Sequence, residues 1–211
     1  MDRPIDEATV TDWLNAVAAP TAAPAGGAAA ALAGALGAAL VEMVAGLTGA
    51  RERYASVHDV AARVGEKAGR LRANMLALAA RDTAAFEAFG RALALPKETL
   101  DQRERRASAR ADAFREGAVV QLDLLARLGE AAELGLEIAE RGLAGALGDA
   151  ATAVFLAGGA ARSARWAVRS NLGEAGEHAT NTERLAMAAV LLERVEENER
   201  RVRQLLEERV P

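Results

Sequence analysis

The stretch from residue 25 to residue 41 contains no charged side chain and consists almost entirely of Ala, Gly and Leu. Ala has the highest intrinsic helix propensity, so this stretch predicts a helix that is apolar on every face. We place the helix from Gly26 to about Thr48, with Pro24 before it and Gly49 as its C-terminal stop. Such a helix has to be buried on all sides, and its internal glycines allow neighbouring helices to approach closely. The sequence therefore predicts a central helix surrounded by other helices.

The same segment has almost the length of a membrane-spanning helix. Its Ala and Gly side chains gain little from lipid, and no second long apolar segment stands out after it. We therefore expect a buried core helix and no membrane insertion. The chain starts with polar residues and shows no apolar signal segment, which makes a cytoplasmic location the default expectation.

Composition excludes several classes of protein. Only 3% of the residues are aromatic and Ile occurs twice, which favours helices over strands. The net charge of -4 gives no general attraction to phosphate backbones, so we expect no nucleic-acid partner. The chain has no Cys and only two isolated His, His58 and His178. Disulfides, cysteine nucleophiles and zinc sites built from Cys or several His are therefore excluded.

Apolar residues recur at spacings of three and four in five further segments, each with a candidate capping residue or stop signal. These segments run from about 6 to 19, from the Ser56 cap to about 93, from the Thr99 cap to about 141, from the Asp149 cap to 173, and from the Thr180 cap beyond 206. A flexible glycine-rich loop is expected at 142–148. The pattern predicts an all-α fold, one domain over residues 1–211 with about six long helices, completing its burial as a dimer.

Asp82 interrupts the apolar stripe of the helix that ends near residue 93. Leu78 and Phe86 lie four residues before and after it, so the pattern places the carboxyl group on the core-facing side. Burying a carboxylate costs free energy unless the group is paired or performs chemistry. Two interpretations are open from the residues alone. Asp82 forms a structural ion pair with an arginine, or it has a raised pKa and transfers protons.

Two other places offer groups that bind anions. Gly26 and Gly27 start a helix and can present backbone N–H groups, although a tight turn after the prolines also explains them. Arg51, Arg53 and Tyr54 follow the end of that helix. They form either a helix-end charge cluster or a clamp for a substrate carboxylate.

Three more polar residues have simple structural explanations. Asp149 stands where a helix N-cap belongs. Lys97 follows a proline in a loop and is expected to be solvated. Asn171 lies at the edge of an apolar helix face, where a hydrogen-bonded amide is common.

Read in order, these segments resemble the formimidoyltetrahydrofolate cyclodeaminase and methenyltetrahydrofolate cyclohydrolase family over nearly the whole chain, from about Trp13. The shared motifs are Pro24-Ala25-Gly26-Gly27 with the Gly-Ala-Leu-Gly-Ala-Ala-Leu run at 34–40, Asp82-x-x-Ala85-Phe86 followed by Leu95-Pro96-Lys97, Gly142 with Asp149, and Val168-x-x-Asn171-Leu172. Each motif is short, and their order and spacing together carry the resemblance.

The resemblance implies an all-helical homodimer that acts on folate one-carbon units, with a small-molecule folate as its partner and no metal or redox cofactor. It also implies one pocket near a subunit interface. The implied catalytic residues are Asp82, Asp149 and Lys97. The implied substrate-binding residues are Gly26, Gly27, Arg51, Arg53, Tyr54 and Asn171.

Two reactions fit the resemblance. One is hydrolysis of 5,10-methenyltetrahydrofolate to 10-formyltetrahydrofolate, and the other is cyclisation of 5-formiminotetrahydrofolate with release of ammonia. In both reactions Asp82 is implied to move a proton, while Lys97 and the arginines hold folate carboxylates.

Seven family positions carry other residues in this chain: Ala25, Ala28, Glu52, Gln121, Leu143, Gly148 and Ala167. Several of these changes remove hydrogen-bonding side chains, each worth about 1–3 kcal/mol to a buried substrate group. A non-catalytic folate-binding or structural dimer is therefore the alternative, followed by a different enzyme on the same scaffold. We expect Asp82, Asp149 and Lys97 to line one cleft if the chain is an enzyme. An arginine paired with Asp82 would oppose its catalytic role.

Overall fold

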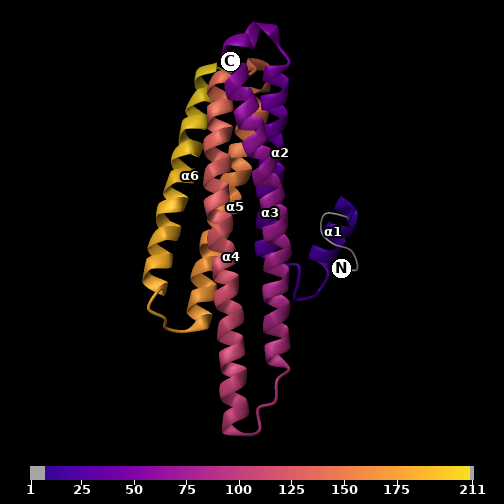
Figure 1. Cartoon of the computed structure of the whole chain (residues 1–211), viewed down its shortest axis with the longest axis vertical. Helices are drawn as coiled ribbons and strands as arrows, with labels where there is room; N and C mark the ends of the chain where they lie inside the picture. Colours follow the sequence, from indigo (N-terminus) through magenta and orange to yellow (C-terminus); the bar gives the residue numbers. More distant parts are fainter. Residues whose placement is uncertain (1–7, 210–211) are drawn as a thin grey trace.

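The computed structural model describes residues 8–209, which contain α-helices and short 3-10 helices but no strand, so the predicted all-α fold is confirmed. Figure 1 shows the long helices in an elongated bundle, with the short first helix beside it. The helices are α1 (Val10–Ala18), α2 (Gly26–Gly49), α3 (His58–Leu93), α4 (Leu100–Arg141), α5 (Leu147–Ala175) and α6 (Asn181–Arg209). The 3-10 helices span Glu52–Val57 and Ala144–Ala146.

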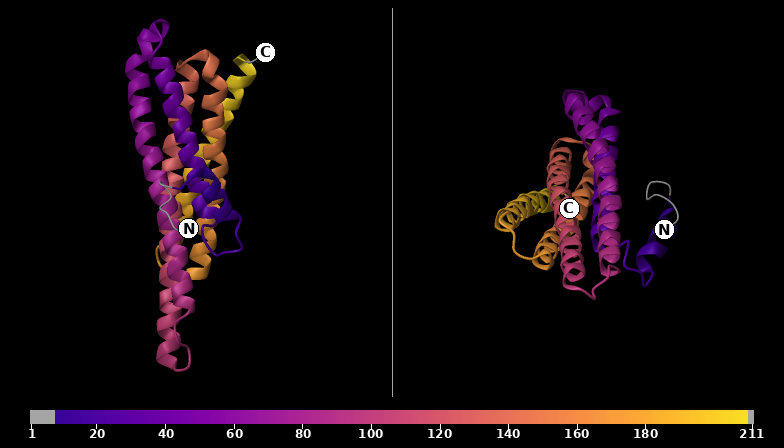
Figure 2. Two further views of the ribbon diagram at one scale, coloured as in Figure 1. Left: turned by 90° about the vertical axis from the view of Figure 1, so that its right-hand side faces the viewer. Right: turned by 60° about the horizontal axis from the view of Figure 1, so that its bottom comes forward.

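The central helix α2 packs against α3, α4 and α5, while α6 covers α4 and α5. The hairpin of α3 and α4 is longer than the rest of the bundle. Its tip projects beyond the start of α2 and beyond the α5–α6 turn (Figures 1 and 2).

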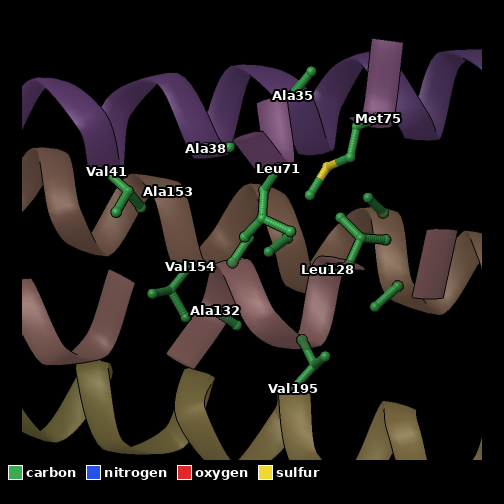
Figure 3. Close-up of a cluster of buried hydrophobic side chains, with 14 of the residues drawn as sticks. Ala35, Ala38, Val41, Leu71, Met75, Leu128, Ala132, Ala153, Val154 and Val195 are labelled. Atoms are coloured by element: carbon green, nitrogen blue, oxygen red, sulfur yellow. The ribbon is translucent and has the colours of Figure 1, made fainter. Parts of the chain in front are cut away.

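Glycines in α2 set the close spacing of the core. A Cβ at Gly34 would lie 2.5 Å from Leu128 Cδ2 and 2.7 Å from Met75 Sδ, so only glycine fits there without a shift. A Cβ at Gly37 would lie 2.9 Å from the carbonyl oxygen of Ala153 on α5. Figure 3 shows Met75 and Leu128 reaching into the layer between α2 and α4. The expected close approach of neighbouring helices is confirmed.

The prediction that α2 is buried on every side is wrong for one subunit. Leu36, Met43 and Leu47 are 57%, 42% and 39% exposed. Their spacings of seven and four residues place them on one face of the helix. The three neighbouring helices pack against the rest of α2, and nothing in residues 8–209 covers this apolar face.

Two segments are long and apolar enough to cross a membrane, α2 and residues 144–175. The expectation of a single such segment is therefore wrong. The second segment is rich in Ala and Gly and was not recognised as a long apolar stretch. In each segment 56% of the most apolar window is buried against the rest of the chain. We interpret both as core helices on that ground.

Sequence signals placed several helix ends correctly. The helix α3 ends at Leu93, and α4 runs to Arg141 as predicted. Thr99 caps α4, since its side chain accepts the N–H of Gln102 while the Gln102 side chain accepts the N–H of Thr99.

Other helix ends differ from the prediction. Ser56 does not cap α3, because residues 52–57 form a 3-10 helix that leads directly into it. Asp149 is not an N-cap either, since α5 already begins at Leu147 and Asp149 lies in its first turn.

At the remaining ends, α1 begins at Val10 because Thr9 and Asp12 form a capping box. Residues 6 and 7 of the predicted helix lie outside the described part of the chain. The helix α5 continues to Ala175, two residues past the predicted stop, and ends at Gly176, whose φ of 82° is accessible to glycine.

Candidate functional site

Asp82 lies on α3, is half-buried, and faces the first turn of α2. Its carboxylate accepts the backbone N–H of Ala28. The residue before α2, Ala25, has no side chain that can cap the helix. Asp82 therefore supplies, from another helix, the negatively charged acceptor that the positive end of a helix dipole favours. The predicted core-facing orientation of Asp82 is confirmed.

The absence of a side chain at Gly27 allows the Asp82 carboxylate to lie close to the backbone of α2. A Cβ at Gly27 would be 2.4 Å from Asp82 Oδ1 and 2.6 Å from Oδ2, which no real contact permits. The glycine is thus needed for close approach of the backbone to Asp82. Gly26 precedes it, is exposed, and has open space where a Cβ would be.

Gln121 on α4 completes the surroundings of Asp82. Its side-chain Nε2 donates a hydrogen bond of 2.6 Å to Asp82 Oδ1. The residue is 1% exposed, and its Oε1 is buried without a hydrogen-bond partner. From the sequence, Gln121 stands out only as a departure from the family pattern, and its contact with Asp82 was not predicted. The available signal was a polar residue on the apolar stripe of α4, four residues before Leu125.

Burial raises the pKa of the Asp82 carboxyl group above its ordinary value, and the hydrogen bonds from Gln121 and Ala28 only partly offset this rise. The adjacent Arg81 is engaged elsewhere, pairing with Glu116 at 2.9 Å and Asp123 at 3.4 Å. Within residues 8–209 Asp82 has no ion-pair partner, so the structural ion-pair interpretation is wrong. A half-buried acid that retains its proton to a higher pH is suited to proton transfer.

Asn171 on α5 lies close to this group. A Cβ at Gly117 would lie 2.8 Å from Asn171 Nδ2. Gly117 precedes Gln121 by four residues on α4, which is about 6 Å along the helix axis. Asn171, which contacts the Gly117 position, therefore lies about one helical turn from Gln121. A groove of about 410 Å³ begins beside it, lined by residues that include Leu172 and Gly173. Asp82 does not line this groove.

Lys97 does not join the site within one subunit. It lies in the exposed loop that connects α3 to α4, at the tip of the projecting hairpin (Figure 1). Leu93 follows Asp82 by eleven positions on α3, which is about 16 Å along the helix axis, and Lys97 lies beyond Leu93.

Tyr54 lies at the opposite end of the bundle, where α2 ends. Its hydroxyl accepts the backbone N–H of Ala144 at 3.0 Å. The hydroxyl of Thr48 accepts the N–H of Leu143 at 2.9 Å, which ties the loop before α5 to the same end of α2. Asp149 follows in the first turn of α5 and is exposed.

The predicted binding arginines belong to this second group. Arg51 and Arg53 are exposed and directly follow α2, and the Arg53 guanidinium lies 5.1 Å from the centre of the Tyr54 ring. From Gly27 to Thr48 the helix spans about 32 Å.

The expectation that all these residues converge in one pocket is therefore wrong for a single subunit. The structure brings Asp82, Gly27 and Asn171 together at one end of α2 and Asp149 with the Arg51–Tyr54 segment at the other. In the described part of the chain, no group of three or more His, Cys, Asp or Glu side chains is placed to hold a metal ion.

Comparisons with known proteins agree with this architecture. A family model described as formiminotransferase-cyclodeaminase matches residues 9–190. The chain is 32% identical to a protein of Methylorubrum extorquens named methenyltetrahydrofolate cyclohydrolase, over 90% of this chain and 94% of that protein. The solved structure of a formiminotetrahydrofolate cyclodeaminase from Thermotoga maritima superimposes with a TM-score of 0.87. It covers 97% of this chain and 98% of its own at 24% identity, which establishes a shared fold.

Proposed function

Since the chain belongs to the formiminotransferase-cyclodeaminase family, we propose that it is an enzyme of folate one-carbon chemistry that hydrolyses 5,10-methenyltetrahydrofolate to 10-formyltetrahydrofolate. The name of the Methylorubrum extorquens relative supports this choice of reaction. Cyclisation of 5-formiminotetrahydrofolate with release of ammonia is the second candidate, because the family description includes a cyclodeaminase. A non-catalytic folate-binding dimer is the alternative that the family and relative names do not favour.

The environment of Asp82 carries the proposal. Asp82 has no ion-pair partner in the described part of the chain and is held by Gln121 and the Ala28 N–H, which is a costly arrangement for a purely structural carboxyl group. Four replaced positions lack a hydrogen-bonding side chain that the family carries: Ala28, Leu143, Gly148 and Ala167. Ala28 lies at the start of α2, Leu143 in the loop before α5, and the other two in α5 itself. None of those losses removes Asp82 or its two hydrogen-bond donors.

In the proposed hydrolysis, water adds to the methenyl carbon, forming a carbon–oxygen bond. The bond from that carbon to the N5 ring nitrogen then breaks, and the carbon stays on N10 as a formyl group. Asp82 takes a proton from the attacking water and returns it to N5 as that nitrogen leaves. The remaining hydroxyl proton passes to solvent as the formyl C=O bond forms, so the positive charge of the methenyl group leaves as one proton. No atom changes oxidation state, so the reaction needs no redox cofactor, and we propose that no metal takes part. EDTA treatment is expected to leave the rate unchanged.

We propose that the second group of residues reaches Asp82 from another subunit. Residues 37 and 38 lie midway between Gly27 and Thr48, close to the exposed Leu36. A two-fold axis at this level packs α2 antiparallel against its copy and covers the exposed apolar face. The end that carries Asp149 and Tyr54 in one subunit then lies beside Asp82 of the other. Arg51, Arg53 and Lys97 are proposed to hold folate carboxylates.

The test follows the ultraviolet absorbance of 5,10-methenyltetrahydrofolate with purified protein, after subtraction of spontaneous hydrolysis. The wild type is expected to clear the methenyl band faster than buffer. Asp82→Asn is expected to lose at least about 100-fold of the enzymatic rate, as general acid–base groups do. The exposed Asp59 on α3 provides the matched control, and Asp59→Asn is expected to keep the rate.

Ammonia release from 5-formiminotetrahydrofolate measures the second candidate reaction in the same samples. If neither reaction exceeds buffer, the enzyme proposal fails and the folate-binding alternative takes its place. A cytoplasmic location and the absence of nucleic-acid or membrane partners stay predictions.

A further inference from the structure

Gln121 is a polar residue at a buried position of α4, where an apolar side chain would cost less free energy to bury. The side chain is 1% exposed and lies on the stripe of α4 that continues with Leu125 and Leu128. Its Oε1 is buried with no hydrogen-bond partner. An unpaired buried acceptor costs about 1–3 kcal/mol. Among residues 8–209, the side-chain hydrogen bond that offsets this cost is the 2.6 Å bond from Nε2 to Asp82 Oδ1.

The side-chain amide of Gln121 carries a donor, Nε2, and an acceptor, Oε1, and rotation of the amide can bring either atom to Asp82. When Asp82 is ionised it only accepts, and the amide N–H of Gln121 is the matching donor. When Asp82 takes up a proton it becomes a donor, and the matching atom is the amide oxygen. A half-turn of the Gln121 amide exchanges the two atoms and brings the orphaned Oε1 to Asp82.

Gln121 is the side chain next to Asp82 that can adjust its hydrogen bond when Asp82 gains or loses a proton. The facing segment of α2 has no charged residue between positions 25 and 41. On α4, Glu116 and Asp123 flank Gln121, and both pair with Arg81. No charged group contributes to the raised pKa of Asp82, which has burial as its cause. From α5, the nearby Asn171 is neutral.

We propose that Gln121 is the positioning residue of Asp82, holding the carboxyl group in place in both protonation states by donating an N–H to the carboxylate and, after a half-turn of the amide, accepting the O–H of the acid. This inference rests on the proposed proton-transfer role of Asp82. A proton carrier held in both states keeps its position through the catalytic cycle, whereas misplacement of a catalytic group by about 1 Å costs up to about 100-fold in rate.

The first test needs no substrate. It follows the Asp82 carboxyl carbon and the Gln121 side-chain NH₂ group by NMR during a pH titration of the labelled wild-type protein. The NH₂ signals are expected to shift with the same midpoint as the Asp82 carbon. In Asp82→Asn protein the NH₂ signals are expected to stop shifting. Signals of Gln121 that ignore the Asp82 transition would overturn the proposal.

The second test uses Gln121→Met, which keeps the length of the side chain and removes the amide. Loss of the donor is expected to raise the pKa of Asp82 further, because the hydrogen bond favours the ionised form. The rising limb of the kcat profile moves to higher pH, and kcat falls about tenfold with little change in KM. Leu124→Met, a volume-conserving change at a fully buried position of the same helix, is the control and leaves the profile in place.

The two readouts separate this inference from the proposed function. If the NMR signals are coupled but no folate reaction is found, the pairing stands and the proposed reaction fails. If the wild type turns over methenyltetrahydrofolate but Gln121→Met has the wild-type pH profile, the reaction stands and the positioning role is wrong.

Discussion

The α-carbon of Gly27 lies so close to the Asp82 carboxylate that a methyl group there would be 2.4 Å from Oδ1. Backbone of one helix and carboxyl group of another are therefore in direct contact. This contact turns the start of α2 into one wall of the candidate site. It also gives Gly27 a role that its position after two prolines does not explain.

Gly27→Ala is expected to displace the Asp82 carboxylate and break its hydrogen bond with the Ala28 N–H. The rate of methenyltetrahydrofolate hydrolysis should then fall by about 100-fold, as for other misplaced catalytic groups. Gly46→Ala on the same helix is the control, since nothing lies within 4 Å of the added methyl group. Wild-type activity of Gly27→Ala would contradict the placement of the site.

Asp82→Asn is expected to make the stability of the protein less dependent on pH. The folded-state pKa of Asp82 lies above its unfolded value, so the folded state holds the proton more tightly. Its contribution is fully present below the unfolded pKa and is lost as pH rises through the folded pKa. Asn still accepts from Gln121 and never ionises.

Thermal melts at acidic and at mildly alkaline pH measure this effect. The difference in Tm between Asp82→Asn and wild type should become more favourable to the variant as pH rises. In a protein of this size, about 2–4 °C corresponds to about 1 kcal/mol. A Tm difference that stays constant over pH would show that Asp82 is not destabilised by its environment.

Glu199 is expected to stabilise the contact between α5 and α6. It is 4% exposed, packs against Gly158, and pairs with Arg162 at 2.8 Å and with Arg203. Glu199→Ala should lower the free energy of unfolding by about 1–3 kcal/mol, because it removes hydrogen bonds to two charged partners. The loss is no larger, since both arginines are partly exposed and bind water when Glu199 is removed. Urea denaturation measures this loss. The control is Glu197→Ala, at an exposed ion pair on the same helix, which should change it by less than about 1 kcal/mol.

Leu36→Glu is expected to convert the proposed dimer into a monomer, since it places a charge on the uncovered apolar face of α2, beside the proposed two-fold axis. Light scattering coupled to gel filtration gives the molar mass. Leu100→Glu is the control, because Leu100 is 74% exposed at the start of α4, away from that face. A wild-type protein that is monomeric would refute the dimer proposal directly.

Mixing two inactive variants tests whether the site is shared between subunits. Asp82→Asn and Asp149→Asn are each expected to be inactive alone. After unfolding and refolding together, half of the dimers contain one subunit of each kind and one intact site. Hydrolysis should recover to about a quarter of the wild-type rate. No recovery, while refolded wild type regains activity, would show that Asp82 and Asp149 do not meet in one site across the subunit interface.

Several features followed from local signals. The apolar run of α2, the cap at Thr99 and the end of α3 at Leu93 depend on propensity and on neighbours within one turn. The orientation of Asp82 followed from its place in a stripe of period 3.6. Predicted helix ends were wrong where another local conformation formed, as at Ser56, where a 3-10 helix takes the place of the expected cap.

The pairing of side chains across helices did not follow from those signals. Gln121 and Asp82 are separated by 39 residues, and their contact depends on the register between α3 and α4. The separation of Asp149 from Asp82 depends likewise on which ends of the helices meet. Short motifs in the right order do not report distances in space.

The amino-acid sequence by itself determined the helices, their apolar faces and the inward position of Asp82, because backbone propensity and side-chain periodicity act over a few residues. Only the tertiary structure decided that Gly27, Ala28 and Gln121 surround Asp82, and that one face of α2 stays uncovered. Those outcomes depend on the register and spacing of helices, which the packing of the whole core sets.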